Sequence, residues 1–285
     1  MKILHLLCTD SFSGAENVAC QIITSCSDQN HEFVYCSLDG SIRNVLDTKG
    51  IKFQPINKMS IKELKRVIKI EKPDIIHAHD MRASFYASLV CGEIPLISHC
   101  HNNGFDSQRV SLKSILYFFA AKKAKHIFWV SNTTFSGYKF HKYFKTKSSI
   151  LYNVINFDEV NKKALDDSNI YDYDVVYLGR ITYQKDPIRL IHLFSLLKNI
   201  MPTIKIVVIG NGDMFKETNN LVNQLGLKNN VDFKGYMKNP YKILKDSKVM
   251  VMVSRWEGTP IAALEAMSLG LPIVSTPTDG MPCGL

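Results

Sequence analysis

The sequence predicts an α/β protein built from two doubly wound parallel sheets. Apolar strand-like runs alternate with helix-like runs along the 285 residues, a pattern typical of parallel sheets covered by helices. A polar, irregular stretch at 157–173 interrupts this alternation. We therefore expect a domain at 1–156, a linker at 157–173 and a second domain at 174–285. The apolar content of 46% is sufficient for two buried cores.

The first domain is expected to contain seven extended segments and at least five helices. The extended segments are short and mostly apolar: Lys2–Leu7, Phe33–Ser37, Lys52–Pro55, Asp74–Ala78, Pro95–His99, Ile127–Val130 and Ser149–Tyr152. The helices are the longer runs between them: Asn17–Ser25, Ile42–Lys49, Ile61–Glu71, Ala83–Cys91 and Leu112–His126, followed by one that Ser131 caps. The third helix has apolar residues at Ile61, Leu64, Val67 and Ile68, which is helical spacing.

The second domain repeats the alternation. Its expected strands are Val175–Leu178, Lys205–Ile209, Val231–Lys234, Val249–Val253 and Ile273–Ser275. Its expected helices are Pro187–Lys198, Met214–Leu225, Tyr241–Ser247 and Ile261–Leu269. The linker before it contains the polar run Asp166-Asp167-Ser168-Asn169.

The last strand–helix–strand segment carries the most specific chemistry. A turn, Gly258-Thr259-Pro260, precedes its helix, whose free N–H groups and dipole favour an anion. Glu257 and Glu265 lie eight residues apart, about 12 Å if the stretch were helical, so a close carboxylate pair is not expected. The spacing suits an extended ligand that carries hydroxyl pairs. The alternative is that both glutamates have only structural roles.

These residues resemble a known family. Glu257-x7-Glu265, with Gly258 after the first glutamate and Glu265-Ala-Met-x-x-Gly-x-Pro after the second, resembles the retaining glycosyltransferases of family 4, which have the GT-B fold. A second element, Gly179-Arg180 followed by Lys185, resembles the family's phosphate-binding loop. The resemblance implies two Rossmann-like domains facing a cleft. It also implies transfer of a sugar from a nucleotide diphosphate-sugar to an acceptor, such as a lipid-linked saccharide in envelope or capsular polysaccharide synthesis.

The resemblance assigns roles within the second domain. Arg180 and Lys185 would hold the leaving diphosphate, and two cations are suited to the charge that grows there. Glu257 would orient the sugar hydroxyls beside the backbone of Gly258, Thr259 and Pro260, and Glu265 would bind the ribose diol. No side-chain nucleophile is implied, because in this family the leaving phosphate is thought to accept the proton of the incoming hydroxyl.

Three weaker matches complete the candidate site. Ser13-Gly14-Ala15-Glu16 resembles the family's Gly-Gly-Ala-Glu loop, so Gly14 would face the donor phosphates and the acceptor; a simple glycine turn is the alternative. His101, within Ser98-His99-Cys100-His101-Asn102, resembles the histidine that lies against the donor sugar. Tyr236 ends a segment that resembles the one meeting the base. Gly210-Asn211-Gly212 lacks the third glycine of a dinucleotide fingerprint.

Metal chemistry is an open alternative at four histidines. His77 and His79 share a strand face, and His99 and His101 do likewise. Imidazole is a common metal ligand, but no carboxylate or cysteine spacing accompanies these pairs, and the family needs no metal for catalysis. We therefore expect no metal and no cofactor beside the donor substrate.

The charge is uneven. Residues 1–156 hold 20 Lys/Arg against 12 Asp/Glu, whereas residues 157–285 hold 15 against 14. A basic domain suggests an anionic partner, and because no nucleic-acid-binding signature is present, we expect no nucleic acid. The segment 112–126, apolar with a basic end, fits either an anionic membrane surface or a core helix with a solvated end.

No run approaches 18 apolar residues, the segment Met1–Cys8 is too short to be expected as a signal peptide, and the seven cysteines show no Cys-x-x-Cys pair. These features indicate a cytoplasmic protein, with peripheral attachment to the inner face of the cell membrane as an alternative.

Family members continue well beyond the Glu-x7-Glu helix, whereas this sequence stops ten residues after Ser275. The second sheet is therefore expected to be incomplete. Two other functions stay open: a truncated, inactive or partner-dependent nucleotide-sugar-binding module, and a GT-B epimerase acting on a nucleotide sugar.

Overall fold

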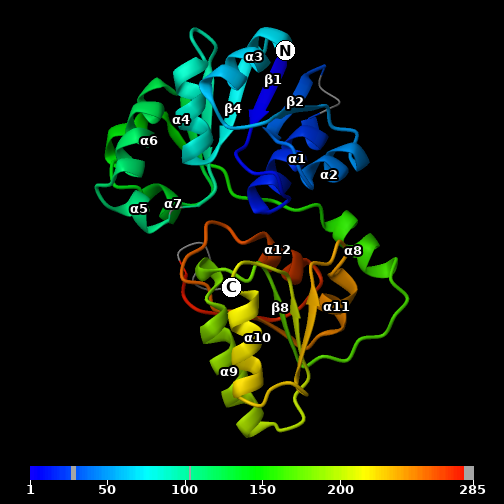
Figure 1. Cartoon of the computed structure of the whole chain (residues 1–285). Coiled ribbons are helices and arrows are strands. Elements are labelled where there is room, and N and C mark those ends of the chain that lie inside the picture. The colour runs from blue at the N-terminus through cyan, green and yellow to red at the C-terminus, as the bar shows by residue number, and fades with distance from the viewer. Residues whose placement is uncertain (27–29, 103, 279–285) are drawn as a thin grey trace. The chain divides into compact units, whose positions relative to one another are not determined.

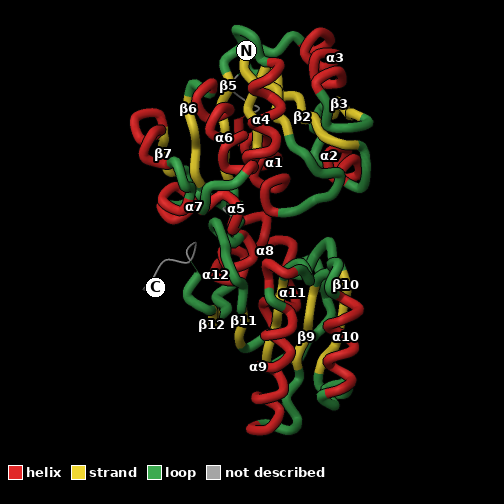
Figure 2. The backbone as a smooth tube through the Cα atoms, turned by 60° about the vertical axis from the view of Figure 1, so that its left-hand side comes forward, coloured by secondary structure: helices red, strands yellow, loops and turns green. Residues whose placement is uncertain are grey.

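The computed structural model describes residues 1–26, 30–102 and 104–278. The chain forms two compact units, Met1–Asn153 and Val154–Leu285, each with one parallel β-sheet and helices packed on it (Figures 1 and 2). Both units are doubly wound α/β structures, as the sequence predicts.

The first unit has a seven-stranded sheet in the order β3-β2-β1-β4-β5-β6-β7. Its strands are β1 (Lys2–Leu6), β2 (Glu32–Leu38), β3 (Phe53–Ile56), β4 (Ile75–His79), β5 (Leu96–Cys100), β6 (His126–Trp129) and β7 (Ser148–Ile150). Its helices are α1 (Gly14–Cys26), α2 (Ile42–Thr48), α3 (Ile61–Glu71), α4 (Asp80–Val90), α5 (Phe105–Gln108), α6 (Leu112–Lys123) and α7 (Asn132–Gly137), with a 3-10 segment at His141–Lys147. The strand order reverses between β1 and β4, the position at which doubly wound sheets bind ligands beyond the carboxyl ends of the strands.

Local signals position the helices of this unit. Ser60 caps α3 by accepting a hydrogen bond from the backbone of Glu63, and the apolar stripe of the helix buries Leu64 and Val67. Ser111 and Ser114 form a reciprocal capping box at the start of α6. The main core lies between α3, α4, α6 and one face of the sheet and includes Trp129 and Tyr117.

The second unit has a five-stranded sheet in the order β10-β9-β8-β11-β12 among its described residues. Its strands are β8 (Val175–Leu178), β9 (Ile206–Ile209), β10 (Val231–Gly235), β11 (Val249–Met252) and β12 (Ile273–Ser275). Its helices are α8 (Phe157–Leu165), α9 (Pro187–Ile200), α10 (Phe215–Gln224), α11 (Tyr241–Asp246) and α12 (Ile261–Ser268), with a 3-10 turn at Tyr183–Lys185. Here the strand order reverses between β8 and β11.

The structure corrects one prediction from the sequence, that of an irregular linker between the two domains. The stretch 157–173, predicted as an irregular linker, contains helix α8. Asn156 caps this helix by accepting a hydrogen bond from the backbone of Glu159, while Val160 and Ala164 are buried against α11 and α12. The sequence does carry signals for this helix, since Phe157, Val160 and Ala164 recur at helical spacing after the cap residue Asn156, but the polar residues around them concealed the pattern.

The loops after β8 and β9 pack backbone to backbone. Gly210 has a φ of +138°, and a Cβ added there would lie 1.9 Å from the carbonyl oxygen of Gly179. At Gly212 an added Cβ would lie 2.2 Å from the carbonyl oxygen of Ile181. The backbone N–H of Ile181 donates to the carbonyl oxygen of Asn211 at 2.9 Å. The two glycines are therefore required for close contact between these loops.

Two further findings, on membrane-spanning helices and on cysteines, apply to the described residues only. No described helix has both the length and the apolar character needed to cross a membrane. The six described cysteines are free thiols; the seventh, Cys283, lies outside the described residues.

We predict that Gly210→Ala destabilises the second unit by at least about 2 kcal/mol, because its methyl group collides with backbone that cannot move aside. The matched control is Gly270→Ala, also at positive φ (+74°) but with open space around the added Cβ; it should cost only about 1 kcal/mol. Urea unfolding followed by the fluorescence of Trp256, in a Trp129→Phe background, measures both. Equal losses in the two variants would contradict the close-contact explanation.

Candidate functional site

The best-formed site lies at the strand-order reversal of the second unit. The loop after β8 runs from Gly179 to Asp186, and the loop after β11 runs from Val253 to Pro260. Since β8 and β11 are neighbouring parallel strands, both loops leave the same edge of the sheet. The turn Tyr183–Lys185 ends at Asp186, which has a left-handed backbone (φ +52°) and begins α9 as its cap.

An ion pair joins the two loops. The Nζ of Lys185 lies 2.5 Å from Oε1 of Glu257, and the two side chains are only 14% and 6% exposed. A charge-assisted contact this short and this well shielded from water is stronger than a surface pair. It brings together the predicted phosphate-binding lysine and the predicted sugar-binding glutamate.

Further contacts fix the spacing of these loops. The backbone N–H of Arg255 donates to the carbonyl oxygen of Gln184 at 2.8 Å, and the Gln184 side chain donates to the carbonyl oxygen of Trp256 at 3.1 Å. The Arg255 guanidinium pairs with Asp186 at 3.0 Å and lies over the Tyr183 ring. Neither Gln184 nor Arg255 was predicted as a site residue. The sequence hinted at the ion pair of Arg255 with Asp186 only by placing an arginine two residues before Glu257.

Arg180 lies next to the pair. Its guanidinium is exposed and donates to Oε1 of Gln184 at 3.3 Å, while its carbonyl oxygen accepts a hydrogen bond from the Tyr177 hydroxyl. The loop after Glu257, Gly258-Thr259-Pro260, leads into the N-terminus of α12, with Gly258 and Pro260 buried. Two cations and a helix N-terminus thus lie close to one carboxylate, an arrangement suited to a phosphate-containing ligand.

Glu265 lies farther along α12, where it is half-buried. Its Oε1 accepts a hydrogen bond from the Tyr241 hydroxyl at 2.9 Å. Burial raises the pKa of Glu265 to about 7, although this hydrogen bond and the charge of Lys163 act in the opposite direction. Tyr241 was not predicted as a site residue. Tyr236, which was, follows β10 directly and is exposed.

The remaining predicted residues lie in the first unit, near its own strand-order reversal. Gly14 is the first residue of α1, with open space around it. Glu16, two residues later, is buried and accepts hydrogen bonds from the hydroxyls of Thr9 and Ser13. The sequence matched Glu16 to a family loop but gave it no role.

His101 follows β5 and is also buried. Its backbone N–H donates to Oδ1 of Asp80 at 2.9 Å, and its Nε2 lies 2.9 Å from Nδ1 of His79. Burial lowers the pKa of His101, while the charges of Asp80 and Glu16 act in the opposite direction. The structure therefore groups Arg180, Lys185, Glu257 and the Gly258–Pro260 turn in one unit, and Gly14 and His101 in the other.

Comparison with known proteins identifies the family of the chain. Residues 12–159 match the family Glycosyltransferase Family 4, and residues 161–284 match Glycosyl transferases group 1. The chain is 31% identical over 242 residues to the uncharacterized glycosyltransferase MJ1059 of Methanocaldococcus jannaschii. That alignment covers 78% of this chain and 59% of the relative.

A second relative is the UDP-Gal:alpha-D-GlcNAc-diphosphoundecaprenol alpha-1,3-galactosyltransferase of Escherichia coli. It is 26% identical over 315 residues, which cover 99% of this chain and 81% of the relative. Among solved structures, Anabaena Alr3699/HepE in complex with UDP and glucose superposes with a TM-score of 0.83 at 18% identity, covering 98% of this chain and 82% of that one. This likeness establishes the shared fold, the GT-B arrangement of two Rossmann-like domains, and the family match spans more than half of the sequence: the chain belongs to glycosyltransferase family 4.

Proposed function

We propose that this chain is a retaining glycosyltransferase that moves a sugar from a nucleotide diphosphate-sugar to a lipid-linked saccharide during envelope or capsular polysaccharide synthesis. The observation that carries the proposal is the shielded Lys185–Glu257 pair at the strand-order reversal, with Arg180 beside it. The Escherichia coli relative supports both substrates, since its name describes a UDP-Gal donor and a diphosphoundecaprenol acceptor.

The donor would lie across the loops after β8 and β11. Its diphosphate would meet Arg180, Lys185 and the N-terminus of α12, its ribose diol would meet Glu265, and its sugar hydroxyls would meet Glu257. Tyr236, which directly follows β10, would meet the base. Gly14 and His101 of the first unit would contact the donor phosphates and the sugar, respectively.

In the transfer step the bond between the sugar C1 and the leaving phosphate oxygen breaks, and a bond from the acceptor oxygen to C1 forms on the same face. The proton of the acceptor hydroxyl passes to the leaving phosphate. Negative charge grows on the diphosphate as the bond breaks, so Arg180 and Lys185 lower the barrier by being in place beforehand. We propose that these two cations are sufficient to stabilise this charge and that no metal or other cofactor takes part in the step.

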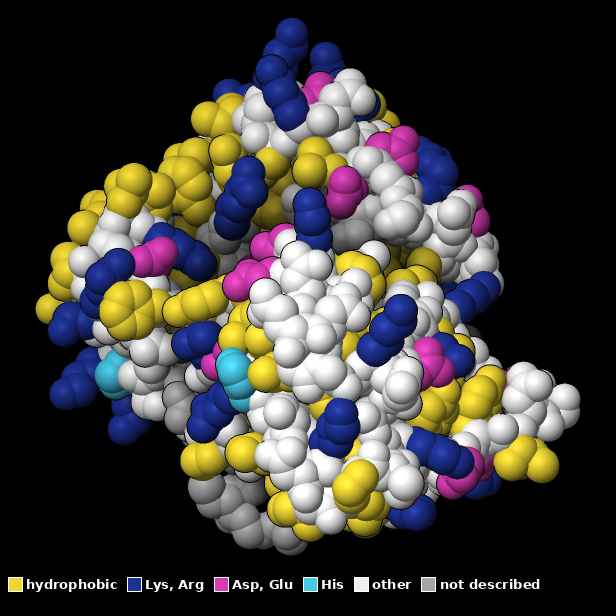
Figure 3. Space-filling model, turned by 60° about the horizontal axis from the view of Figure 1, so that its bottom comes forward, with side chains coloured by type: hydrophobic (Ala, Val, Ile, Leu, Met, Phe, Trp, Pro, Cys, Tyr) yellow, Lys and Arg dark blue, Asp and Glu magenta, His cyan; other side chains and the backbone are white. Residues whose placement is uncertain are grey.

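We also propose that the first unit docks on an anionic membrane, where a lipid-linked acceptor resides. Helix α6 packs one face on the core through Tyr117 and Ala121, so it is a core helix on that side. Its other face exposes Leu112 (74%) and Phe119 (61%) and ends at lysines 122 and 123. In Figure 3, hydrophobic and basic side chains lie next to one another on the left side, where Figure 1 has α5 and α6.

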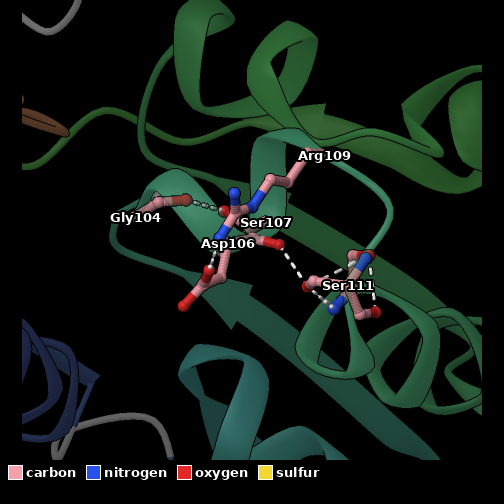
Figure 4. Close-up of polar contacts among 6 residues, drawn as sticks. Gly104, Asp106, Ser107, Arg109 and Ser111 are labelled. Carbon is pink, nitrogen blue, oxygen red and sulfur yellow. Dashed lines mark hydrogen bonds and ion pairs between the residues drawn. The ribbon is translucent and has the colours of Figure 1, made fainter.

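Hydrogen bonds and an ion pair order the turn before α6 (Figure 4). The Ser107 hydroxyl donates to the carbonyl oxygen of Gly104, and the Ser111 hydroxyl donates to that of Asp106. Arg109 pairs with Asp106 at 3.0 Å and lies over the exposed ring of Phe105. An ordered apolar edge with basic neighbours is suited to a lipid interface.

The proposal is tested by thermal unfolding with UDP, GDP and ADP, followed by incubation of the stabilising nucleotide's sugar conjugates with undecaprenyl-diphosphate-linked saccharides. Nucleotide stabilisation with acceptor-dependent release of nucleoside diphosphate is the expected result. Stabilisation without turnover would favour a binding module, and a changed sugar without an acceptor would favour an epimerase. No stabilisation by any nucleotide would contradict the proposal.

We predict that Lys185→Gln lowers kcat by about 100- to 1,000-fold, because the lysine stabilises charge that develops in the transition state. The KM for the donor should change far less. Lys205→Gln is the matched control, since Lys205 forms an ion pair of similar length with Asp172 on an exposed part of the same unit; its kinetics should match the unaltered chain. A fall in kcat no larger than that of the control would show that Lys185 does not stabilise the transition state.

We predict that affinity for the nucleotide diphosphate-sugar rises as pH increases through about 7. Only the ionised Glu265 carboxylate accepts two hydrogen bonds from a diol, and the pKa of this group is raised to about 7. Glu265→Gln should bind more weakly and without this pH dependence, whereas Glu217→Gln on exposed α10 should behave like the unaltered chain. Titration calorimetry between pH 5.5 and 8.5 measures the effect, and a retained pH dependence in Glu265→Gln would exclude this group as its source.

We predict that the double variant Leu112→Glu/Phe119→Glu reduces binding to anionic phospholipid vesicles at least tenfold, because each buried apolar side chain contributes roughly 1.5–3 kcal/mol. Ile70→Glu, an equally polar change at an exposed position on α3, is the control. Vesicle flotation at low and high salt gives the readout. Absence of binding by the unaltered chain would contradict the membrane proposal without affecting the transferase proposal.

A further inference from the structure

Five histidines cover one face of the first sheet at its centre. His5 is on β1, His77 and His79 are on β4, His99 is on β5, and His101 follows β5 directly. In the strand register His5 lies opposite His77, and His79 lies opposite His99. All five side chains are buried, and neighbouring rings have centroids as close as 4.3 Å.

Hydrogen bonding within the cluster is incomplete. Nδ1 of His5 lies 3.0 Å from Nε2 of His79, and Nδ1 of His79 lies 2.9 Å from Nε2 of His101. Five other ring nitrogens are buried without a hydrogen-bond partner among the described residues: His5 Nε2, His77 Nε2, His99 Nδ1, His99 Nε2 and His101 Nδ1. Leaving such a group unsatisfied costs roughly 1–3 kcal/mol, so five in one place are far more than packing alone explains.

Two sets of three histidines have ring nitrogens that all lie within 4.8 Å of one another: His5, His77 and His79; and His79, His99 and His101. Negative charge distinguishes them. Asp80 accepts the backbone hydrogen bond of His101, and both Asp80 and buried Glu16 act electrostatically on the His101 ring. Asp80 is also held at a φ of +68°, a strained conformation for a residue with a side chain. A buried cation needs nearby anions, which favours the second set.

We propose that His79, His99 and His101 hold a divalent transition-metal ion of the zinc class. Nδ1 of His79 and Nε2 of His101 already face each other, and an ion between them at about 2.0–2.1 Å from each requires only a small separation of the two rings. His99 completes the set with one of its two unpartnered nitrogens. Three imidazoles with a fourth position left to water is an established zinc coordination.

This ligation gives one of the five unpartnered nitrogens, on His99, a partner and keeps the contact between His79 and His5. With Nδ1 of His79 on the metal, its Nε2 carries the proton and donates to Nδ1 of His5, a contact that orients the ligand. With Nε2 of His101 on the metal, its Nδ1 carries the proton. The inference goes beyond the proposed transfer step, in which no metal takes part, although the two share His101, which is a sugar contact there and a metal ligand here.

The test uses the full chain without a histidine tag, dialysed against zinc and then against buffer, with bound metal measured by mass spectrometry. Cobalt(II) provides a second readout, because a three-histidine tetrahedral site gives intense visible absorption. The expected result is one equivalent of metal in the unaltered chain and in His77→Leu, and loss of binding in His99→Leu. His77 and His99 are matched, since both are buried on the same sheet face with unpartnered nitrogens, and each belongs to only one of the two sets.

Cooperative thermal unfolding confirms that each variant is folded, and His99→Gln replaces His99→Leu if the latter is not. Absence of metal in the unaltered chain after dialysis would overturn the proposal. So would metal binding retained in a folded His99 variant, including the case in which His77→Leu alone loses it.

Discussion

The contact between Lys185 and Glu257 is the interaction on which the second unit's site depends. Removing both charges from water is costly, and removing only one partner leaves the other charge buried and unpaired. The pair forms because two loops leave neighbouring strands at the same sheet edge, and because Arg255 and Gln184 fix their spacing. Under the proposed function, a bound diphosphate would provide Lys185 with a second anion, so the glutamate holds the lysine in position until the donor arrives.

The same topological rule places the functional groups in both units. Each sheet reverses its strand order once next to the first strand of the unit, at β1/β4 and at β8/β11. The segments that diverge there carry two buried carboxylates: Glu16 in the first turn of α1 and Glu257 in the loop after β11. Close backbone contact at Gly210 then fixes the loop after β8 from its other side. Both sites therefore follow from parallel strands and loop glycines more than from any single side chain.

The sequence was sufficient for the strand–helix alternation, because buried parallel strands are near-continuous apolar runs that polar loops separate. The family motifs also marked Arg180, Lys185 and Glu257, which lie in the loops after β8 and β11, and the structure brings Lys185 and Glu257 into contact. The sequence could not reveal Arg255 or Tyr241, whose roles come from contacts with residues distant in sequence.

The histidine cluster shows the same limit. The pairs His77/His79 and His99/His101 are visible as alternating positions on two strands, but His5 joins them only through the pairing of β1 with β4. Helix α8 was missed for a different reason: polar neighbours concealed the helical spacing of Phe157, Val160 and Ala164, and the contacts that Val160 and Ala164 make with α11 and α12 are visible only in the structure.

Helix α8 also determines where the chain can be divided for separate expression of its second half. A fragment starting at 174, where the first strand of that half begins in the sequence, would lack α8. It would uncover the apolar surface of α11 and α12 and lose the hydrogen bond from the Asn239 side chain to the carbonyl oxygen of Lys163. A fragment starting at 154 keeps that cover. The twenty residues from 154 to 173 therefore decide whether the apolar surface of α11 and α12 stays covered or is exposed to solvent, where it would favour aggregation.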